Sequence, residues 1–168
     1  MQKGRGRGPR SGGPGRGGRR DRPDDGFDQR IVELSRVTRV MAGGKRMRFR
    51  ALVLLGNHQG KVGVGVAKGA DVSLAVAKAS TKARRGLITV PLQGHTIPHE
   101  VTVKYKSARV ILKPAPVGTG IIAGGAVRMV LELAGVPNVV SKILGSANKI
   151  NNVRAVFRAF ATMKKPVR

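Results

Sequence analysis

The sequence predicts an α+β fold made of two small α/β domains that follow a disordered tail. Residues 1–26 are almost entirely Gly, Arg, Pro, Ser and Asp, with no large apolar side chain after Met1. Residues 27–90 show the order strand, strand, strand, helix. After the Pro-bounded linker 91–98, residues 99–168 mix short strands with two helices.

The N-terminal tail and the net charge of the chain indicate a disordered segment and an anionic partner. Too few apolar side chains occur in residues 1–26 to offset the entropy of ordering, so this Arg/Gly-rich segment is predicted to be disordered. The chain carries a net charge of +25, of which +20 belongs to residues 27–168. Such a charge favours a polyanionic partner. A membrane surface is a weaker alternative, because aromatic residues make up only 3% of the chain.

Several classes of protein are excluded by what the sequence lacks. Without cysteine there is no disulfide, no cysteine zinc site and no thiol catalysis. No apolar run reaches the length of a membrane span, and the first residues lack the apolar core of a secretory signal.

Three strands are predicted in the first domain. Residues 27–40 read as a strand with an irregularity near Ser35. In the second strand, 46–55, one face is Met47, Phe49, Ala51, Val53 and Leu55, and the other changes from Arg46, Arg48 and Arg50 to Leu52 and Leu54. The third, 61–68, contains Gly63 and Gly65, which predicts close approach of a helix or another backbone.

A helix follows, starting near Asp71, whose side chain is expected to cap it, and ending at Gly86. Its predicted buried stripe is Val72, Ala75, Val76, Ala79 and Ala83. Residues 87–90 form a short exit strand.

The second domain is predicted from shorter signals. The expected elements are a hairpin (99–106 and 108–113), a Gly/Pro-rich loop (114–125), a helix (126–134), a strand (139–144) and a helix from about Asn148.

Two basic clusters are candidates for RNA binding. Glycines let the turn Gly43-Gly44-Lys45-Arg46 bring its backbone close to a phosphate, and Arg48 adds charge beside it. On the helix, one face carries Lys78, Lys82 and Arg85, and no acidic residue occurs between Asp71 and Glu100. The alternative for both clusters is a solvated charged surface.

The sequence contains little that indicates catalysis, a metal site or a cofactor site. The glycine runs 63–69 and 118–124 place their third glycine one residue late for a dinucleotide-binding loop. His95 and His99 are separated by Pro98, and His58 stands alone, so no metal site is expected. No pair of carboxylates or Ser-His-Asp set emerges. The sequence therefore predicts a non-enzymatic protein without a cofactor.

Residues 27–163 resemble the family of the fifth protein of the bacterial small ribosomal subunit. Four blocks carry the resemblance: RVTRVMAGGKRMRFRALVLLG, GKVGVGVAKGADVSLAVAKASTKARR, SARVILKPAPVGTGIIAGGAVRMVLELAGV and KILGSANKINNVRA. It implies a first domain like the double-stranded-RNA-binding domain and a second domain with a two-layer arrangement, a sheet with two helices on one face.

The resemblance also implies a function. The family binds small-subunit rRNA where head meets body, contacts neighbouring proteins four and eight, lies where mRNA enters, and influences translational accuracy. Gly43, Gly44 and Lys45 match a loop linked to spectinomycin sensitivity. Arg109, Gly120 and Arg128 are the residues expected at the contact with protein four. The sequence leaves open whether the ribosome is cytoplasmic or that of a plastid.

Two other functions remain as alternatives. A free RNA chaperone would bind through the Arg/Gly-rich tail. A kinase-like enzyme would use residues 116–125 as a phosphate loop, although the serines of such a loop are missing.

Overall fold

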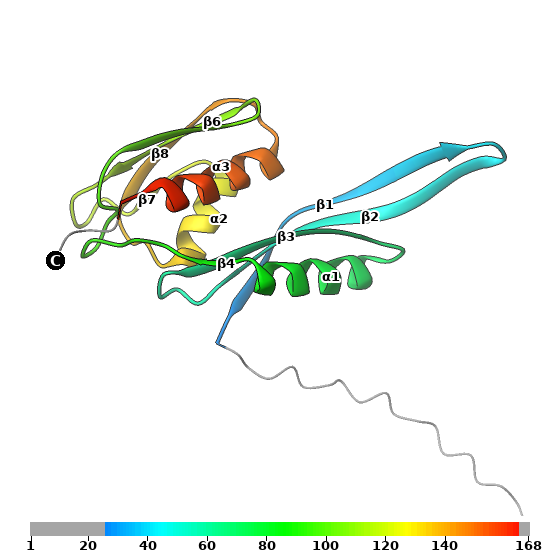
Figure 1. Ribbon diagram of the computed structural model, residues 1–168, viewed down its shortest axis with the longest axis horizontal. Coiled ribbons are helices and arrows are strands. Elements are labelled where there is room, and N and C mark those ends of the chain that lie inside the picture. Colours follow the sequence, from blue (N-terminus) through cyan, green and yellow to red (C-terminus); the bar gives the residue numbers. More distant parts are fainter. Residues whose placement is uncertain (1–25, 165–168) are drawn as a thin grey trace, which may run out of the picture.

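This computed structural model describes residues 26–164. The elements are β1 (Asp28–Met41), β2 (Gly44–Gly56), β3 (Lys61–Gly69), α1 (Val72–Arg85), β4 (Leu87–Thr89), β5 (Val101–Tyr105), β6 (Ala108–Pro114), β7 (Ile121–Ile122), α2 (Gly125–Ala134), β8 (Val139–Gly145) and α3 (Lys149–Thr162). Figure 1 shows four layers: α1, the first sheet, α2 with α3, and the second sheet. The predicted α+β class, with β-β-β-α followed by a sheet with two helices, is confirmed. The predicted tail lies outside the described residues, except for Gly26.

The first sheet is antiparallel, in the order β1-β2-β3-β4. Strand β1 carries a bulge between Ile31 and Glu33, three residues before the predicted irregularity near Ser35. The position predicted from the sequence was therefore wrong. The extra residue is Val32, which is 8% exposed and belongs to the core, so burial of this side chain accounts for the bulge.

Glycines in β3 allow α1 to lie directly on the strand. A Cβ atom at Gly65 would overlap the carbonyl oxygen of Ala79, and one at Gly63 would overlap that of Ala83. The predicted close approach of a helix is confirmed.

The first turn of α1 differs from the prediction. Ala75 is the first helical residue to pack on β3, at Gly69, where the strand ends. Val72 precedes it by one turn and is 36% exposed, so its assignment to the buried stripe was wrong. Asp71 occupies the N-cap position, but its side chain makes no capping hydrogen bond; its carbonyl oxygen accepts from the Ala75 amide at 3.0 Å.

The second sheet has the order β5-β6-β8-β7, with β7 parallel to β8. Strand β7 was predicted as loop, because two residues are too short for a periodic signal. Helix α2 ends at Gly135, whose φ of 76° is the left-handed conformation that glycine favours at this position. Helix α3 starts after Asn148, whose Oδ1 accepts from the amides of Ile150 and Asn151, as predicted.

One core joins the two sheets. Val127, Val130 and Leu131 of α2 belong to the same buried cluster as Leu52 and Leu54 of β2. This cluster also includes side chains of the second sheet and of α3, namely Val110, Leu112, Val153 and Val156. Ile97, from the predicted linker, is 1% exposed in it. The boundaries 27–90, 91–98 and 99–168 stay a prediction.

Backbone hydrogen bonds fix the turn between β2 and β3 to the end of α2. The amides of His58 and Gly60 donate to the carbonyl oxygens of Leu133 (3.0 Å) and Ala134 (2.9 Å). The free carbonyls at the C-terminus of α2 are thus satisfied partly by the other half of the chain. Cβ atoms at Gly56 and Gly135 would overlap the opposing backbone here, so the two glycines permit this close contact.

Candidate nucleic-acid interface

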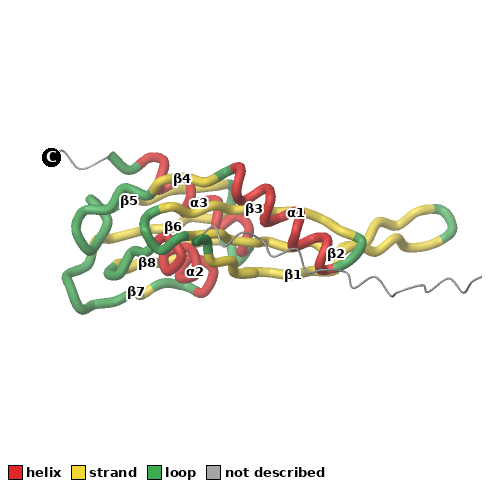
Figure 2. Tube along the Cα trace, turned by 90° about the horizontal axis from the view of Figure 1, so that it is seen from below, coloured by secondary structure: helices red, strands yellow, loops and turns green. Residues whose placement is uncertain are grey.

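A two-stranded hairpin projects from the first sheet. The last residue of β2 that pairs with β3 is Phe49, opposite Gly69, whereas β1 and β2 continue to pair until Met41 meets Gly44. Figures 1 and 2 show this hairpin extending past the body of the molecule. Residues 37–48 are called the basic arm here.

The tip of the basic arm is a glycine turn. Gly43 and Gly44 have φ angles of 88° and 132°, values that residues with a Cβ atom rarely adopt. No atom lies within 4 Å of where a Cβ would stand at either residue. The backbone at the tip is therefore exposed and open to a close partner.

The composition of one face of β2 changes along the strand. Leu52 and Leu54 are buried and belong to the core that α2 completes. Arg50 is half-buried and donates to Ser35 Oγ at 3.1 Å. Arg48 and Arg46, further out on the same face, are exposed. The sheet face is apolar where the second half of the chain covers it and cationic in the arm.

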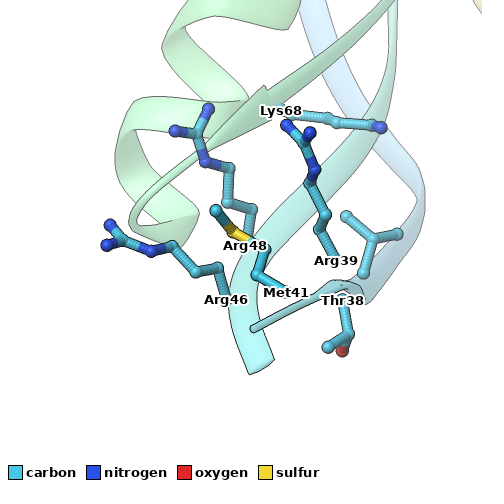
Figure 3. Close-up of a pocket in the computed structure, with 7 residues that line it drawn as sticks. Thr38, Arg39, Met41, Arg46, Arg48 and Lys68 are labelled. Carbon is cyan, nitrogen blue, oxygen red and sulfur yellow. The ribbon is translucent and has the colours of Figure 1, made fainter. Parts of the chain in front are cut away.

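Four cations surround a hollow of about 400 Å³ on the basic arm. Figure 3 shows the side chains of Arg39, Arg46, Arg48 and Lys68 around it. Arg39 and Arg46 are direct cross-strand partners. Like charges in that position are destabilising, so the arrangement costs free energy in the isolated protein and favours an anion in the hollow.

The arm cations have no acidic partner within residues 26–164. The ion pairs there join Arg30 and His58 to Asp28, Arg30 and Arg128 to Glu132, and Lys113 to Glu100. The acidic partners in these ion pairs, Asp28, Glu100 and Glu132, thus lie in the body, and the arm keeps its positive charge.

The predicted basic face of α1 forms a second cluster. Lys78, Lys82 and Arg85 line one shallow hollow with Thr81 and Gly86. The structure therefore brings these three cations together, but not with Arg46 and Arg48. Helix α1 covers one face of the first sheet, and the arm arginines continue the other face, which α2 covers.

Arg39 and Lys68 were missed by the sequence reasoning. The sequence places Arg39 in the first predicted strand, 27–40, and Lys68 at the end of the third, 61–68, with no binding role for either. The signal for Arg39 is the hairpin register: a turn at residues 42–43 places it opposite Arg46. Lys68 reaches the hollow because it pairs with Arg50 across β2 and β3.

The three residues expected at a protein contact lie on different elements. Gly120, with φ 72°, precedes β7, and its amide donates to Asn138 Oδ1 at 3.1 Å. Arg128 is exposed on α2 and pairs with Glu132 at 3.3 Å. Arg109 is exposed on β6 between the buried Ala108 and Val110, so it faces away from the helices.

Residues 26–164 contain no group of three or more His, Cys, Asp or Glu side chains placed to hold a metal ion. None of the helices in that range is long and apolar enough to cross a membrane.

Comparisons with known proteins cover both halves of the chain. Residues 27–91 match the family model for the N-terminal domain of ribosomal protein S5, and residues 103–168 match that for its C-terminal domain. These matches were expected from the resemblance of the four sequence blocks.

Three similar proteins support the same family assignment. Small ribosomal subunit protein uS5c of Spinacia oleracea is 54% identical over 142 residues, which is 84% of this chain but 46% of that protein. Small ribosomal subunit protein uS5 of Rubrobacter xylanophilus is 51% identical, over 83% of this chain and 71% of its own. The uS5 protein of Thermus thermophilus is 46% identical, over 84% and 88%. This chain belongs to the ribosomal protein S5 family, a structural and non-enzymatic family of the small ribosomal subunit.

Proposed function

We propose that the protein is a structural constituent of the small ribosomal subunit that binds rRNA through the basic arm and through the basic face of α1. The observation that carries this proposal is the hollow of Arg39, Arg46, Arg48 and Lys68, which has no acidic partner within residues 26–164. Family membership makes rRNA the polyanion that this hollow would meet.

The binding mechanism is neutralisation of phosphates combined with recognition of shape. Guanidinium groups can donate two parallel hydrogen bonds to one phosphate. Gly43 and Gly44 let the tip approach the RNA backbone, and Lys45 beside them adds charge. Lys78, Lys82 and Arg85 lie on the opposite face of the sheet, so the two basic surfaces would contact different RNA segments.

A role in protein contacts and accuracy is the finer part of the proposal. The partners would be small-subunit proteins four and eight, with mRNA at the point where it enters. Gly120 lies in the chain between two exposed apolar side chains, Val117 of the preceding loop (78% exposed) and Ile122 of β7 (54% exposed), which would suit a protein neighbour. Arg128 is exposed on α2. Arg109 faces another side and would meet a different surface.

The site of action would be a ribosome, in the cytoplasm or in a plastid. Relatives named uS5 and uS5c both align over more than four fifths of the chain.

The test of RNA binding is a double variant, Lys45→Ala with Arg46→Ala. We expect weaker binding to small-subunit rRNA, and a slope of log affinity against log salt that falls by roughly 0.9 for each duplex phosphate that is no longer neutralised. The matched control is Lys104→Ala with Lys142→Ala, two exposed lysines of the second sheet. If affinity and slope matched wild type in the arm variant, the arm would not be an RNA contact.

The RNA chaperone hypothesis gives a different result. It requires that deletion of residues 1–26 abolishes RNA binding. The proposed function requires a smaller loss, because the arm and α1 remain intact.

A further inference from the structure

One buried side chain connects separate segments of the second half of the chain. Asn138 directly precedes β8 and is 6% exposed. Its Oδ1 accepts hydrogen bonds from the amides of Gly118 and Gly120, both at 3.1 Å. Its Nδ2 donates to the carbonyl oxygen of His95 at 3.2 Å. Because backbone amides can only donate, the atom that faces the two glycines must be the carboxamide oxygen. Both polar atoms of this side chain are thus bonded to backbone.

The backbone around Asn138 adds to this connection. Its carbonyl oxygen accepts from Thr96 Oγ1 at 2.8 Å, and the same hydroxyl oxygen accepts from the Ala115 amide at 3.1 Å. The Val139 amide donates to the carbonyl oxygen of Gly120 at 3.1 Å. The loop that begins at Ala115 and ends at Gly120 is therefore held at both ends by this part of the chain.

Residues 115–120, called the glycine loop here, have a backbone that needs such support. Gly118 and Gly120 have φ angles of 96° and 72°, and a Cβ atom at either would meet nothing within 4 Å. The backbone conformation, rather than packing, therefore requires glycine at these two positions. Glycine loses more conformational freedom on ordering than any other residue. The hydrogen bonds to Asn138 offset that loss.

The glycine loop presents an uncharged, apolar surface. Residues 114–127 contain no charged side chain, although the chain carries a net charge of +25. Val117 within the loop is 78% exposed, and Ile122 of β7, just after the loop, is 54% exposed. Exposed apolar side chains without cations suit a protein partner and not a polyanion. Figures 1 and 2 show β7 at the end of the molecule opposite the basic arm.

The amides of the glycine loop are not directed at an outside ligand. A phosphate-binding loop points free amides at the phosphate and adds a lysine beside them. Here the amides of Gly118 and Gly120 donate to Asn138, and residues 114–127 contain no lysine. These hydrogen bonds therefore shape the loop and do not form an anion site.

We propose that Asn138 positions the glycine loop for a protein neighbour, whose apolar side chains contact Val117 and Ile122. With the hydrogen bonds of Asn138 in place, the loop already has the conformation that the partner binds, so its ordering entropy is not lost on association. Without them, only a fraction of the molecules would be competent to bind, and the apparent dissociation constant would rise in proportion. The inference rests on the proposed function, because it names the residue that shapes the protein contact proposed for Gly120.

The first measurement needs no substitution. Hydrogen exchange of the Gly118 and Gly120 amides is followed by NMR in the full-length, ¹⁵N-labelled protein. We expect both amides to exchange much more slowly than the amide of Gly43 at the exposed tip of the basic arm, because each is bonded to a buried acceptor. Exchange of both amides as fast as that of Gly43 would overturn the proposal.

The first variant, Asn138→Ala, removes the acceptor. We expect fast exchange at both glycines and about tenfold weaker binding of small-subunit protein four, as follows if the loop keeps its conformation in roughly a tenth of the molecules. Calorimetry with the full-length chain measures the affinity. The matched control is Asn148→Ala, which removes the same side chain where it also accepts from two amides, those of Ile150 and Asn151. Equal losses of affinity in the two variants would mean general destabilisation and contradict the proposal.

A second variant, Asn138→Asp, keeps the acceptor and changes only the donor. Its carboxylate still accepts from Gly118 and Gly120, whereas the bond to the His95 carbonyl is lost. We expect amide exchange and affinity closer to those of the unsubstituted protein than to those of Asn138→Ala. If Asn138→Asp kept both amides protected but bound protein four as weakly as Asn138→Ala, positioning of the loop would not be the role of Asn138.

The pair Val117→Ser with Ile122→Ser tests the contact itself. It should weaken binding of protein four and leave the exchange of the Gly118 and Gly120 amides unchanged. If this pair weakened binding while Asn138→Ala bound normally despite fast exchange, the proposed contact would stand and the role of Asn138 would be wrong. If the pair bound as tightly as the unsubstituted protein, or if the unsubstituted protein did not bind protein four, the proposed contact would be wrong, and this inference with it.

Discussion

The two ends of strand β2 have opposite surroundings. At one end, residues 51–56 are buried between α1 on one face and α2 on the other. At the other end, residues 44–48 are exposed in the basic arm. Along one face, the side chains change from Leu54 and Leu52 to Arg48 and Arg46. The chain itself covers the apolar end, so the cationic end is the part that is left for a partner outside the chain.

This difference separates two physical requirements. The covered end depends on shape, because helix backbone lies directly on Gly63 and Gly65 and a Cβ atom would not fit. The arm depends on charge, because its cations lack acidic partners within residues 26–164. Variants at the covered end should therefore change the free energy of unfolding, and variants in the arm should change affinity for RNA.

The largest expected effect is on stability at the covered end. Gly65→Ala would force the Ala79 carbonyl and the β3 backbone apart, and we expect a loss of about 3 kcal/mol or more in the free energy of unfolding. Chemical denaturation measures it. Gly125→Ala is the matched control, since a Cβ there meets open space. Equal stability of the two variants would mean that α1 does not press on β3 as closely as the structure shows.

A smaller effect, this time on RNA binding, is expected on α1. Replacing Lys78, Lys82 and Arg85 by glutamine should reduce the salt slope of rRNA binding by about 0.9 for each duplex phosphate that these side chains neutralise. The melting temperature should change little, because the three side chains are exposed. The slope is measured by filter binding over a range of salt concentrations. An unchanged slope would mean that this face is a solvated charged surface and not an RNA contact.

The smallest effect is expected at Glu132, whose ion pair with Arg30 joins the two halves and whose pair with Arg128 lies within α2. Glu132 pairs with Arg30 at 2.6 Å and with Arg128 at 3.3 Å, but all three side chains are about a third exposed or more. Glu132→Gln should therefore cost less than about 1 kcal/mol of stability. The halves are joined mainly by the shared core and by the backbone bonds of His58 and Gly60. If Glu132→Gln lowered the free energy of unfolding by several kcal/mol in thermal denaturation, the ion pairs would contribute more to stability than their exposure indicates.

The fold was predictable where the signals are long or strongly constrained. The second strand shows its change from Arg to Leu on one face, and the glycines of the third strand indicate a close helix. The helix start near Asn148 was predicted, and the structure shows the Asn148 side chain capping it. The bulge at Val32 and the strand β7 were not, because each depends on contacts with residues distant in sequence.

The candidate site was predictable in part. The turn Gly43-Gly44 and the cations beside it stand out in the sequence. Arg39 and Lys68 become visible only through pairing across strands, which brings them to Arg46 and Arg50.

We expect the basic arm to bind RNA and to contribute little to the stability of the body. The most direct test shortens the hairpin by replacing residues 38–47 with Asn-Gly, a two-residue turn that suits paired strands. Melting temperature and the salt dependence of rRNA affinity are then measured against the full-length chain. We expect a body of nearly unchanged stability, with weaker rRNA binding and a clearly lower salt slope. Unchanged affinity and slope in the shortened protein would contradict it.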